Sequence, residues 1–267
     1  MKRLLLYLNV VALALTILMN GLSESGFFST RMSDAGESRA VFFLPAGYVF
    51  SIWGLIYLAL VGFAYYQARH EEAREAVGWY FILSCAANIA WLILFLNNLV
   101  WLSMVAMLVL LFSLVMMYRR INATEKPDAA RYWLLHFPFS VYLGWISVAT
   151  VANFSAALHD AGYVTKFLGI SADIWAAAMM IVTGVLALAF IFLRRDYVYA
   201  LVIVWGLVGI YARPFAGDNF APLRDLNVGL VHTTALGVSV LIALAVLLHF
   251  GRRLLQDRSP DTRPSTA

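Results

Sequence analysis

The chain has 267 residues, of which 63% are hydrophobic and only 13% are charged. A soluble domain carries about 25% charged and about 45–50% apolar residues, so this composition excludes a soluble enzyme. The formal net charge of +4 could suggest a nucleic-acid binder. The basic residues, however, lie in the gaps between apolar runs, where lipid headgroups would be, and this placement argues against that class.

Apolar runs recur along the whole sequence with only short polar breaks. A helix needs about 20 apolar residues to cross roughly 30 Å of hydrocarbon. Runs of this kind predict an all-α polytopic membrane bundle of about eight transmembrane helices, at residues 4–20, 46–67, 77–96, 99–118, 135–158, 172–193, 197–211 and 228–250. The seventh run is the shortest and meets the length requirement least well.

The distribution of basic residues predicts the orientation of these helices. If the N-terminus is cytoplasmic, only five of the 19 Lys and Arg residues fall in outer loops: Arg31, Arg39, Lys166, Arg213 and Arg224. The positive-inside rule therefore places both termini in the cytoplasm. The first 26 residues also fit a secretory signal peptide, although no A-x-A cleavage site follows them, and this alternative stays open.

Three of the predicted helices carry aromatic and amide side chains at helical spacing. These sets are Phe50, Trp53 and Tyr57; Asn88, Trp91 and Phe95; and Trp145, Ala149 and Asn153. Asn88 and Asn153 lie well inside their runs, where an amide costs free energy unless it finds a partner. Both should therefore face the interior, whereas Trp101 and Trp133, near span ends, fit the interfacial belt. Three such faces together predict an internal pocket with flat aromatic walls and a few polar groups.

The sequence offers no catalytic or metal-binding constellation. It contains no H-E-x-x-H motif, no cluster of Cys and His, and no Gly-rich phosphate loop. No Asp, Glu, Lys or Arg occupies the middle of a predicted span, which argues against an ion-coupled transporter or pump. We therefore assign no catalytic residue and no metal ligand.

The same aromatic segments carry a resemblance to a known family. LPAGYVFSIWGLIY (residues 44–57), NIAWLILF (88–95) and YLGWISVATVANF (142–154) resemble, in the expected order, three motifs of the TspO/MBR family. Its members are tryptophan-rich sensory proteins related to the mitochondrial translocator protein. The chain departs from the family pattern at Leu44 and Val141, where prolines are usual.

The resemblance implies a five-helix transmembrane unit over residues 1–158, followed by an additional three-helix region (159–250) and a disordered cytoplasmic tail (251–267). It implies an integral protein of a bacterial inner membrane, surrounded by lipid, and it suggests a homodimer. Gly206 and Gly209 could allow close helix packing in such a dimer.

The resemblance also implies a receptor or sensor that binds a flat hydrophobic ligand, notably a porphyrin or other tetrapyrrole. Transport of such a ligand is the alternative function. Some relatives are reported to promote porphyrin breakdown, but no enzyme activity and no required cofactor follow from this sequence. The spacing and the resemblance together predict the ligand-binding residues Phe50, Trp53, Tyr57, Asn88, Trp91, Trp145 and Asn153.

Overall fold

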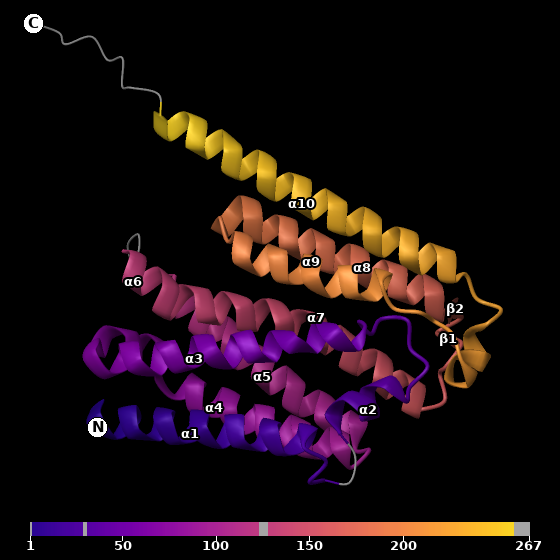
Figure 1. The fold of residues 1–267 in the computed structure, drawn as a ribbon, viewed down its shortest axis with the longest axis horizontal. Coiled ribbons are helices and arrows are strands. Elements are labelled where there is room, and N and C mark those ends of the chain that lie inside the picture. The colour runs from indigo at the N-terminus through magenta and orange to yellow at the C-terminus, as the bar shows by residue number, and fades with distance from the viewer. Residues whose placement is uncertain (1, 29–30, 123–127, 259–267) are drawn as a thin grey trace, which may run out of the picture.

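The computed structural model describes residues 2–28, 31–122 and 128–258 as a bundle of long helices (Figure 1). The long helices are α1 (Lys2–Glu24), α3 (Ile52–Arg69), α4 (Glu71–Leu96), α5 (Val100–Ile121), α7 (Phe137–Asp160), α8 (Ala172–Ala189), α9 (Tyr197–Tyr211) and α10 (Val228–Arg258). The short helices are α2 (Met32–Glu37) and α6 (Ala129–Arg131). The 3-10 turns are η1 (Gly47–Ser51) and η4 (Asp218–Leu223), and the π turns are η2 (Tyr132–His136) and η3 (Phe190–Arg194). Strands β1 (Lys166–Phe167) and β2 (Ile170–Ser171) form one antiparallel hairpin.

Within the described residues, seven helical segments are long and apolar enough to cross a membrane. The remaining predicted span, the seventh in chain order, coincides with α9, whose 15 residues cover only about 22 Å at roughly 1.5 Å per residue. The start of α1 and the end of α10 lie at the same end of the bundle (Figure 1), as eight passes of the chain require. The protein is therefore an all-α polytopic membrane bundle, as predicted.

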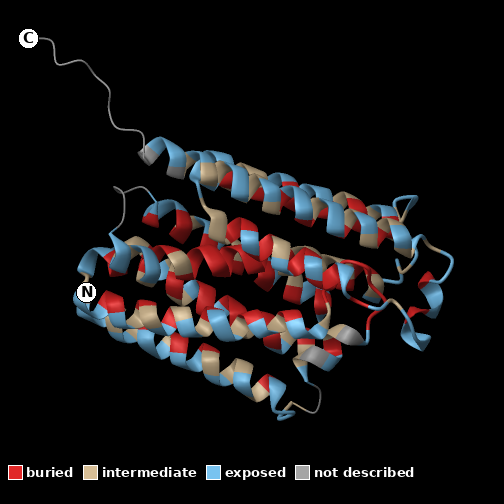
Figure 2. Cartoon of the chain, turned by 45° about the horizontal axis from the view of Figure 1, so that its top comes forward, coloured by how far each residue is buried: buried red, intermediate tan, exposed pale blue. Residues whose placement is uncertain are grey.

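The bundle has two parts that share one hydrophobic core. Helices α1, α3, α4, α5 and α7 pack together. Of the last three long helices, α9 packs against α7, and α10 packs against α8 and α9 (Figure 1). One core cluster extends from Leu13 in α1 to Ile242 in α10. Buried residues gather between the helices, whereas the outer faces carry exposed apolar side chains such as Leu58 and Leu244 (Figure 2). Such faces suit a hydrocarbon environment.

Two helices are longer than the apolar pattern predicts. Helix α4 begins at Glu71, because two acidic residues in its first turn favour a helix N-terminus. It bends at Gly78, whose φ of 52° is a conformation that glycine adopts without strain. Helix α10 continues to Arg258, so residues 251–258 are helical rather than part of the predicted tail; residues 259–267 lie outside the described residues.

Helix α1 is attached to the bundle by two pairs of amide side chains. Asn9 Nδ2 donates to Gln67 Oε1 in α3 at 2.8 Å, and Asn20 Nδ2 donates to Asn88 Oδ1 in α4 at 2.8 Å. Hydrogen bonds between transmembrane helices stabilise their association by about 0.6 kcal/mol each on average. These contacts tie both halves of α1 to the neighbouring helices.

Candidate functional site

A narrow apolar cavity lies where η1 and α3 meet α4, α7 and the segment before η1. Five of the predicted residues line it: Phe50, Trp53, Trp91, Trp145 and Asn153. The cavity volume is about 50 Å³, and a single water needs about 10–15 Å³ by this measure. The free protein therefore has room here for only a few water molecules.

Trp53 is the centre of the aromatic cluster beside this cavity. Its ring stacks on Trp91 at 6.2 Å between centroids and on Tyr57 at 5.5 Å. The rings of Tyr142 and Trp145 meet it edge to face at 5.8 and 6.3 Å. Each of these separations lies in the range in which aromatic pairs attract, about 4.5–7 Å. Side chains from α3, α4 and α7 thus form one continuous set of flat rings.

The other two predicted residues, Tyr57 and Asn88, lie behind the cavity lining. Asn88 is fully buried; it accepts the hydrogen bond from Asn20 and donates through Nδ2 to Tyr142 Oη at 3.1 Å. Tyr57 supports Trp53 by stacking. In the protein without a ligand, Asn88 holds α1 and Tyr142 in place and Tyr57 supports the ring of Trp53. Neither residue forms part of the cavity surface.

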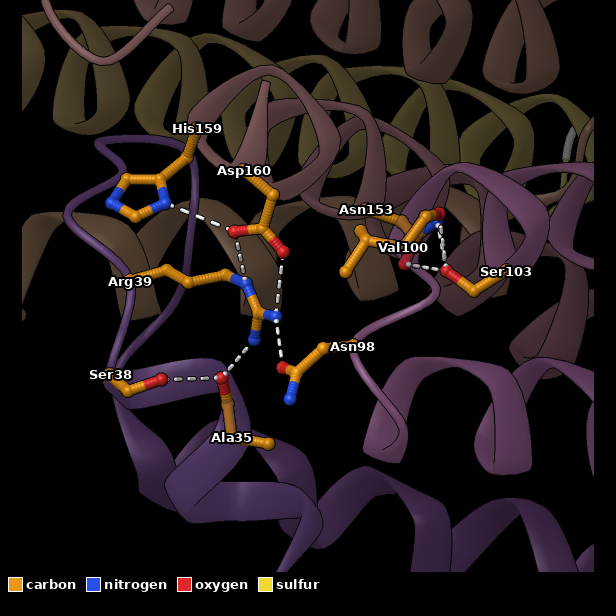
Figure 3. Close-up of polar contacts among 9 residues, drawn as sticks. All are labelled: Ala35, Ser38, Arg39, Asn98, Val100, Ser103, Asn153, His159 and Asp160. Carbon is orange, nitrogen blue, oxygen red and sulfur yellow. Dashed lines mark hydrogen bonds and ion pairs between the residues drawn. The ribbon is translucent and has the colours of Figure 1, made fainter. Parts of the chain in front are cut away.

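Asn153 holds the ring of Trp91 in place. Trp91 Nε1 donates to Asn153 Oδ1 at 3.2 Å, and Asn153 Nδ2 donates to Ser103 Oγ at 3.2 Å. Ser103 in turn donates to the carbonyl of Val100 at 2.7 Å (Figure 3). This chain of hydrogen bonds joins α4, α5 and α7, and it satisfies an amide that would otherwise be costly in a membrane interior.

One polar group of the cavity has no partner among the described residues. The Nε1 of Trp145 is buried without a hydrogen bond, although the Trp145 side chain lines the cavity. An unsatisfied buried donor costs about 1–3 kcal/mol. A ligand that carries a hydrogen-bond acceptor could recover this free energy.

The cavity is covered by a segment that we call the strap, residues 32–46, which comprises α2 and the extended chain after it. Met32, Gly36, Val41, Leu44 and Pro45 line the cavity from this side. The chain from residue 40 to residue 44 is buried throughout, although it contains no helix or strand. The strap is therefore a packed part of the protein and forms one wall of the cavity.

Arg39 attaches the strap to the ends of α7 and α4. Its guanidinium donates to both carboxylate oxygens of Asp160, at 2.9 and 2.8 Å, and to Asn98 Oδ1 at 3.0 Å (Figure 3). It also donates to the carbonyl of Ala35 within the strap and lies 4.8 Å from the ring centroid of Phe95, which lines the cavity. Two-point binding of a carboxylate by arginine is a strong, oriented interaction.

The sequence pattern did not identify Arg39 as part of the site. The charge pattern indicates only a basic residue in an outer loop, where an exposed side chain is expected, whereas the Arg39 side chain is 6% exposed. The apolar run at residues 40–44, just after Arg39 and before Pro45, is the signal that could have indicated a buried segment. The partner Asp160 is 121 residues away, and no local pattern indicates such a pair.

No group of three or more His, Cys, Asp or Glu side chains that could hold a metal ion occurs in the described part of the chain. The charged Arg39 is neutralised by Asp160, which also accepts a hydrogen bond from His159 Nδ1 at 3.1 Å in the tautomer that carries a proton on this nitrogen. The cavity itself offers aromatic faces, aliphatic surface and few polar atoms.

Comparison with known proteins agrees with this architecture. The profile of the family described as TSPO-like protein matches residues 6–248, a range that begins within α1, ends within α10 and includes the other long helices in full. No curated protein and no solved structure matches the chain at a significant level. The matched region covers most of the sequence, and the chain therefore belongs to the TSPO-like protein family.

Proposed function

We propose that this TSPO-like membrane protein is a receptor or sensor for a flat hydrophobic ligand of the porphyrin or tetrapyrrole class. The observation that carries the proposal is the set of rings around Trp53, with Trp91 and Trp145 beside the cavity. Extended aromatic faces suit a planar π-system, because stacked and edge-to-face pairs add about 0.5–1.5 kcal/mol each beyond burial.

The size of the cavity sets a condition on binding. Pockets for drug-sized ligands usually measure about 300–1,000 Å³, whereas this cavity measures about 50 Å³. A porphyrin can therefore enter only if one wall moves. The strap is the wall best suited to move, because it is not part of a transmembrane helix and Arg39 attaches it at a few polar contacts.

The unpaired donor in the cavity suggests which part of the ligand is polar. Trp145 Nε1 has no acceptor in the described structure, and Asn153 supplies an amide on the same helix. A carboxylate or carbonyl group on the ligand would accept from Trp145 Nε1, whereas Asn153 Nδ2 already donates to Ser103 Oγ. The propionate groups of protoporphyrin IX provide such acceptors at the edge of a flat ring.

The test is a titration of the purified protein with protoporphyrin IX in detergent, followed by tryptophan quenching and by the porphyrin absorbance band. Trp53→Leu and Trp145→Leu should each weaken binding by about tenfold, since each removes ring contacts worth about 1 kcal/mol or more. Trp101→Leu is the matched control, because it also removes one fluorophore but from a residue that is 50% exposed. Equal affinity in all four proteins would overturn the site, and linear, non-saturable quenching would overturn the ligand class.

We propose further that the protein lies in a bacterial inner membrane with both termini in the cytoplasm, and that it forms a homodimer there. The excess of basic residues at the end of the bundle that carries both termini supports this orientation. The sequence suggests Gly206 and Gly209 as contacts between the two copies of a dimer. Both residues are buried within one chain and therefore do not form such a contact. Crosslinking in native membranes tests the dimer directly.

A further inference from the structure

The three helices after α7 contribute no side chain to the described cavity, whose lining ends at Ala156. We call residues 44–50, the part of the cavity wall that leads into α3, the wall segment. Helix α9 lies directly behind this segment. We infer that α9 is a positioning element that holds the wall segment in place and thereby sets the affinity for the ligand. This inference rests on the proposed function and adds a role for the C-terminal region.

Hydrogen bonds from α9 satisfy backbone groups of the wall segment. Trp205 Nε1 donates to the carbonyl of Val49 at 3.0 Å, and the Ala46 amide donates to the carbonyl of Gly209 at 3.0 Å. Just beyond the end of α9, Arg213 Nη1 donates to the carbonyl of Leu44 at 3.1 Å. Residues 44–46 lie in no helix or strand, so their backbone groups depend on such partners in a water-poor interior.

Close packing accompanies these hydrogen bonds. A Cβ atom added to Gly209 would overlap the side chain of Val49 and would lie 3.0 Å from Pro45 Cβ. A Cβ added to Gly206 would lie 3.1 Å from a methyl group of Val148, which lines the cavity on α7. Glycine at these two positions lets the α9 backbone approach both cavity walls.

The contact residues form one face of α9. Trp205 and Gly209 are four residues apart and Gly206 adjoins this row, so a single helix surface meets both walls, and Arg213 follows just after the end of the helix. The other side of α9 contacts α10. A shift of α9 would therefore move the wall segment even though no α9 side chain touches the ligand position.

The test uses the full-length protein and a matched set of variants. Gly209→Ala introduces the overlap with Val49, and Val49→Ala/Gly209→Ala removes it again; Val49 is not a cavity-lining residue. Gly237→Ala in α10 is the control, because an added Cβ there meets nothing within 4 Å. Trp205→Phe removes one hydrogen bond and keeps an aromatic ring.

Two readouts are compared across this set. The first is hydrogen–deuterium exchange of residues 46–49, and the second is protoporphyrin IX affinity by absorbance titration. We expect Gly209→Ala to speed this exchange and to weaken binding by about tenfold, as overpacking of a close contact typically costs 1–3 kcal/mol. The double variant should regain most of the wild-type affinity, Trp205→Phe should show a smaller loss, and Gly237→Ala should match the wild type.

The outcomes separate this inference from the proposed function. Unchanged exchange in Gly209→Ala and Trp205→Phe would overturn the role of α9, whatever the affinities are. Faster exchange with unchanged porphyrin affinity would also overturn it, because the wall segment would then move without affecting the site. If the wild type shows no saturable porphyrin binding, the proposed function fails, whereas the exchange comparison still decides whether α9 holds the wall segment.

Discussion

Replacing Arg39 with alanine should loosen the attachment of the strap to the ends of α7 and α4. The substitution removes the two-point pair with Asp160 and the hydrogen bonds to Asn98 and to the Ala35 carbonyl. Loss of one partner of a fully buried ion pair costs about 3–5 kcal/mol, and loss of an exposed pair costs about 1 kcal/mol or less. The Arg39 side chain is 6% exposed and that of Asp160 is 26% exposed. An intermediate cost of about 2–3 kcal/mol is therefore expected.

This cost should appear as local opening rather than as loss of the whole fold. The broken contacts join the strap to the end of α7 and to the turn between α4 and α5 (Figure 3), and they do not join the long helices to one another. A penalty of about 2–3 kcal/mol raises the open fraction of the strap about 30- to 150-fold. Exchange of the strap amides should accelerate by a similar factor.

The assay is hydrogen–deuterium exchange of residues 32–46 in detergent micelles, measured beside a peptide from α7. Arg224→Ala is the control, because its pair with Asp218 is long, at 3.8 Å, and highly exposed. If strap exchange in Arg39→Ala stays within about twofold of the wild type, Arg39 does not hold the strap and the reasoning from burial is refuted. Equal acceleration in α7 would instead indicate general destabilisation.

Two further predictions concern the packing of the bundle. Asn153→Ala leaves Trp91 Nε1 without its acceptor. The free energy of unfolding should fall by about 1 kcal/mol, which lowers the midpoint of thermal unfolding by roughly 2–4 °C. An unchanged midpoint would contradict the role assigned to this amide. Gly184→Ala places a Cβ 2.5 Å from a methyl group of Val238 and should separate α8 from α10, lowering the midpoint by several degrees. Gly237→Ala, which meets open space, should not change it.

The helices were predictable because each is an apolar run long enough to cross a membrane, and part of the site was predictable because its aromatic residues recur at helical spacing. The spacing of Trp53, Trp91 and Trp145 placed each ring on an interior face, and the structure brings these rings together. Asn88 was correctly placed in the interior, but a sequence does not distinguish an amide that faces a cavity from one that pairs with a neighbouring helix. Whether these residues contact a ligand stays a prediction.

Features that depend on distant partners were not predictable. The pair between Arg39 and Asp160 joins residues 121 positions apart, and the strap contains only a six-residue helix. The end of α10 was also missed, since charged residues after Phe250 end the apolar pattern although the backbone stays helical. Arg, Leu and Gln favour helix without requiring burial, so hydropathy alone ends such a helix too early.

The amide pairs of α1 also bear on how the protein is assembled during synthesis. Asn9 and Asn20 pair with residues 58 and 68 positions later in the chain, so both partners are made only after α1 has reached the membrane. Until α3 and α4 arrive, α1 carries two polar groups without their final partners in an apolar environment, which is costly. The arrival of α3 supplies the partner of Asn9 and that of α4 the partner of Asn20, so α1 reaches its final packing only when both later helices are in place.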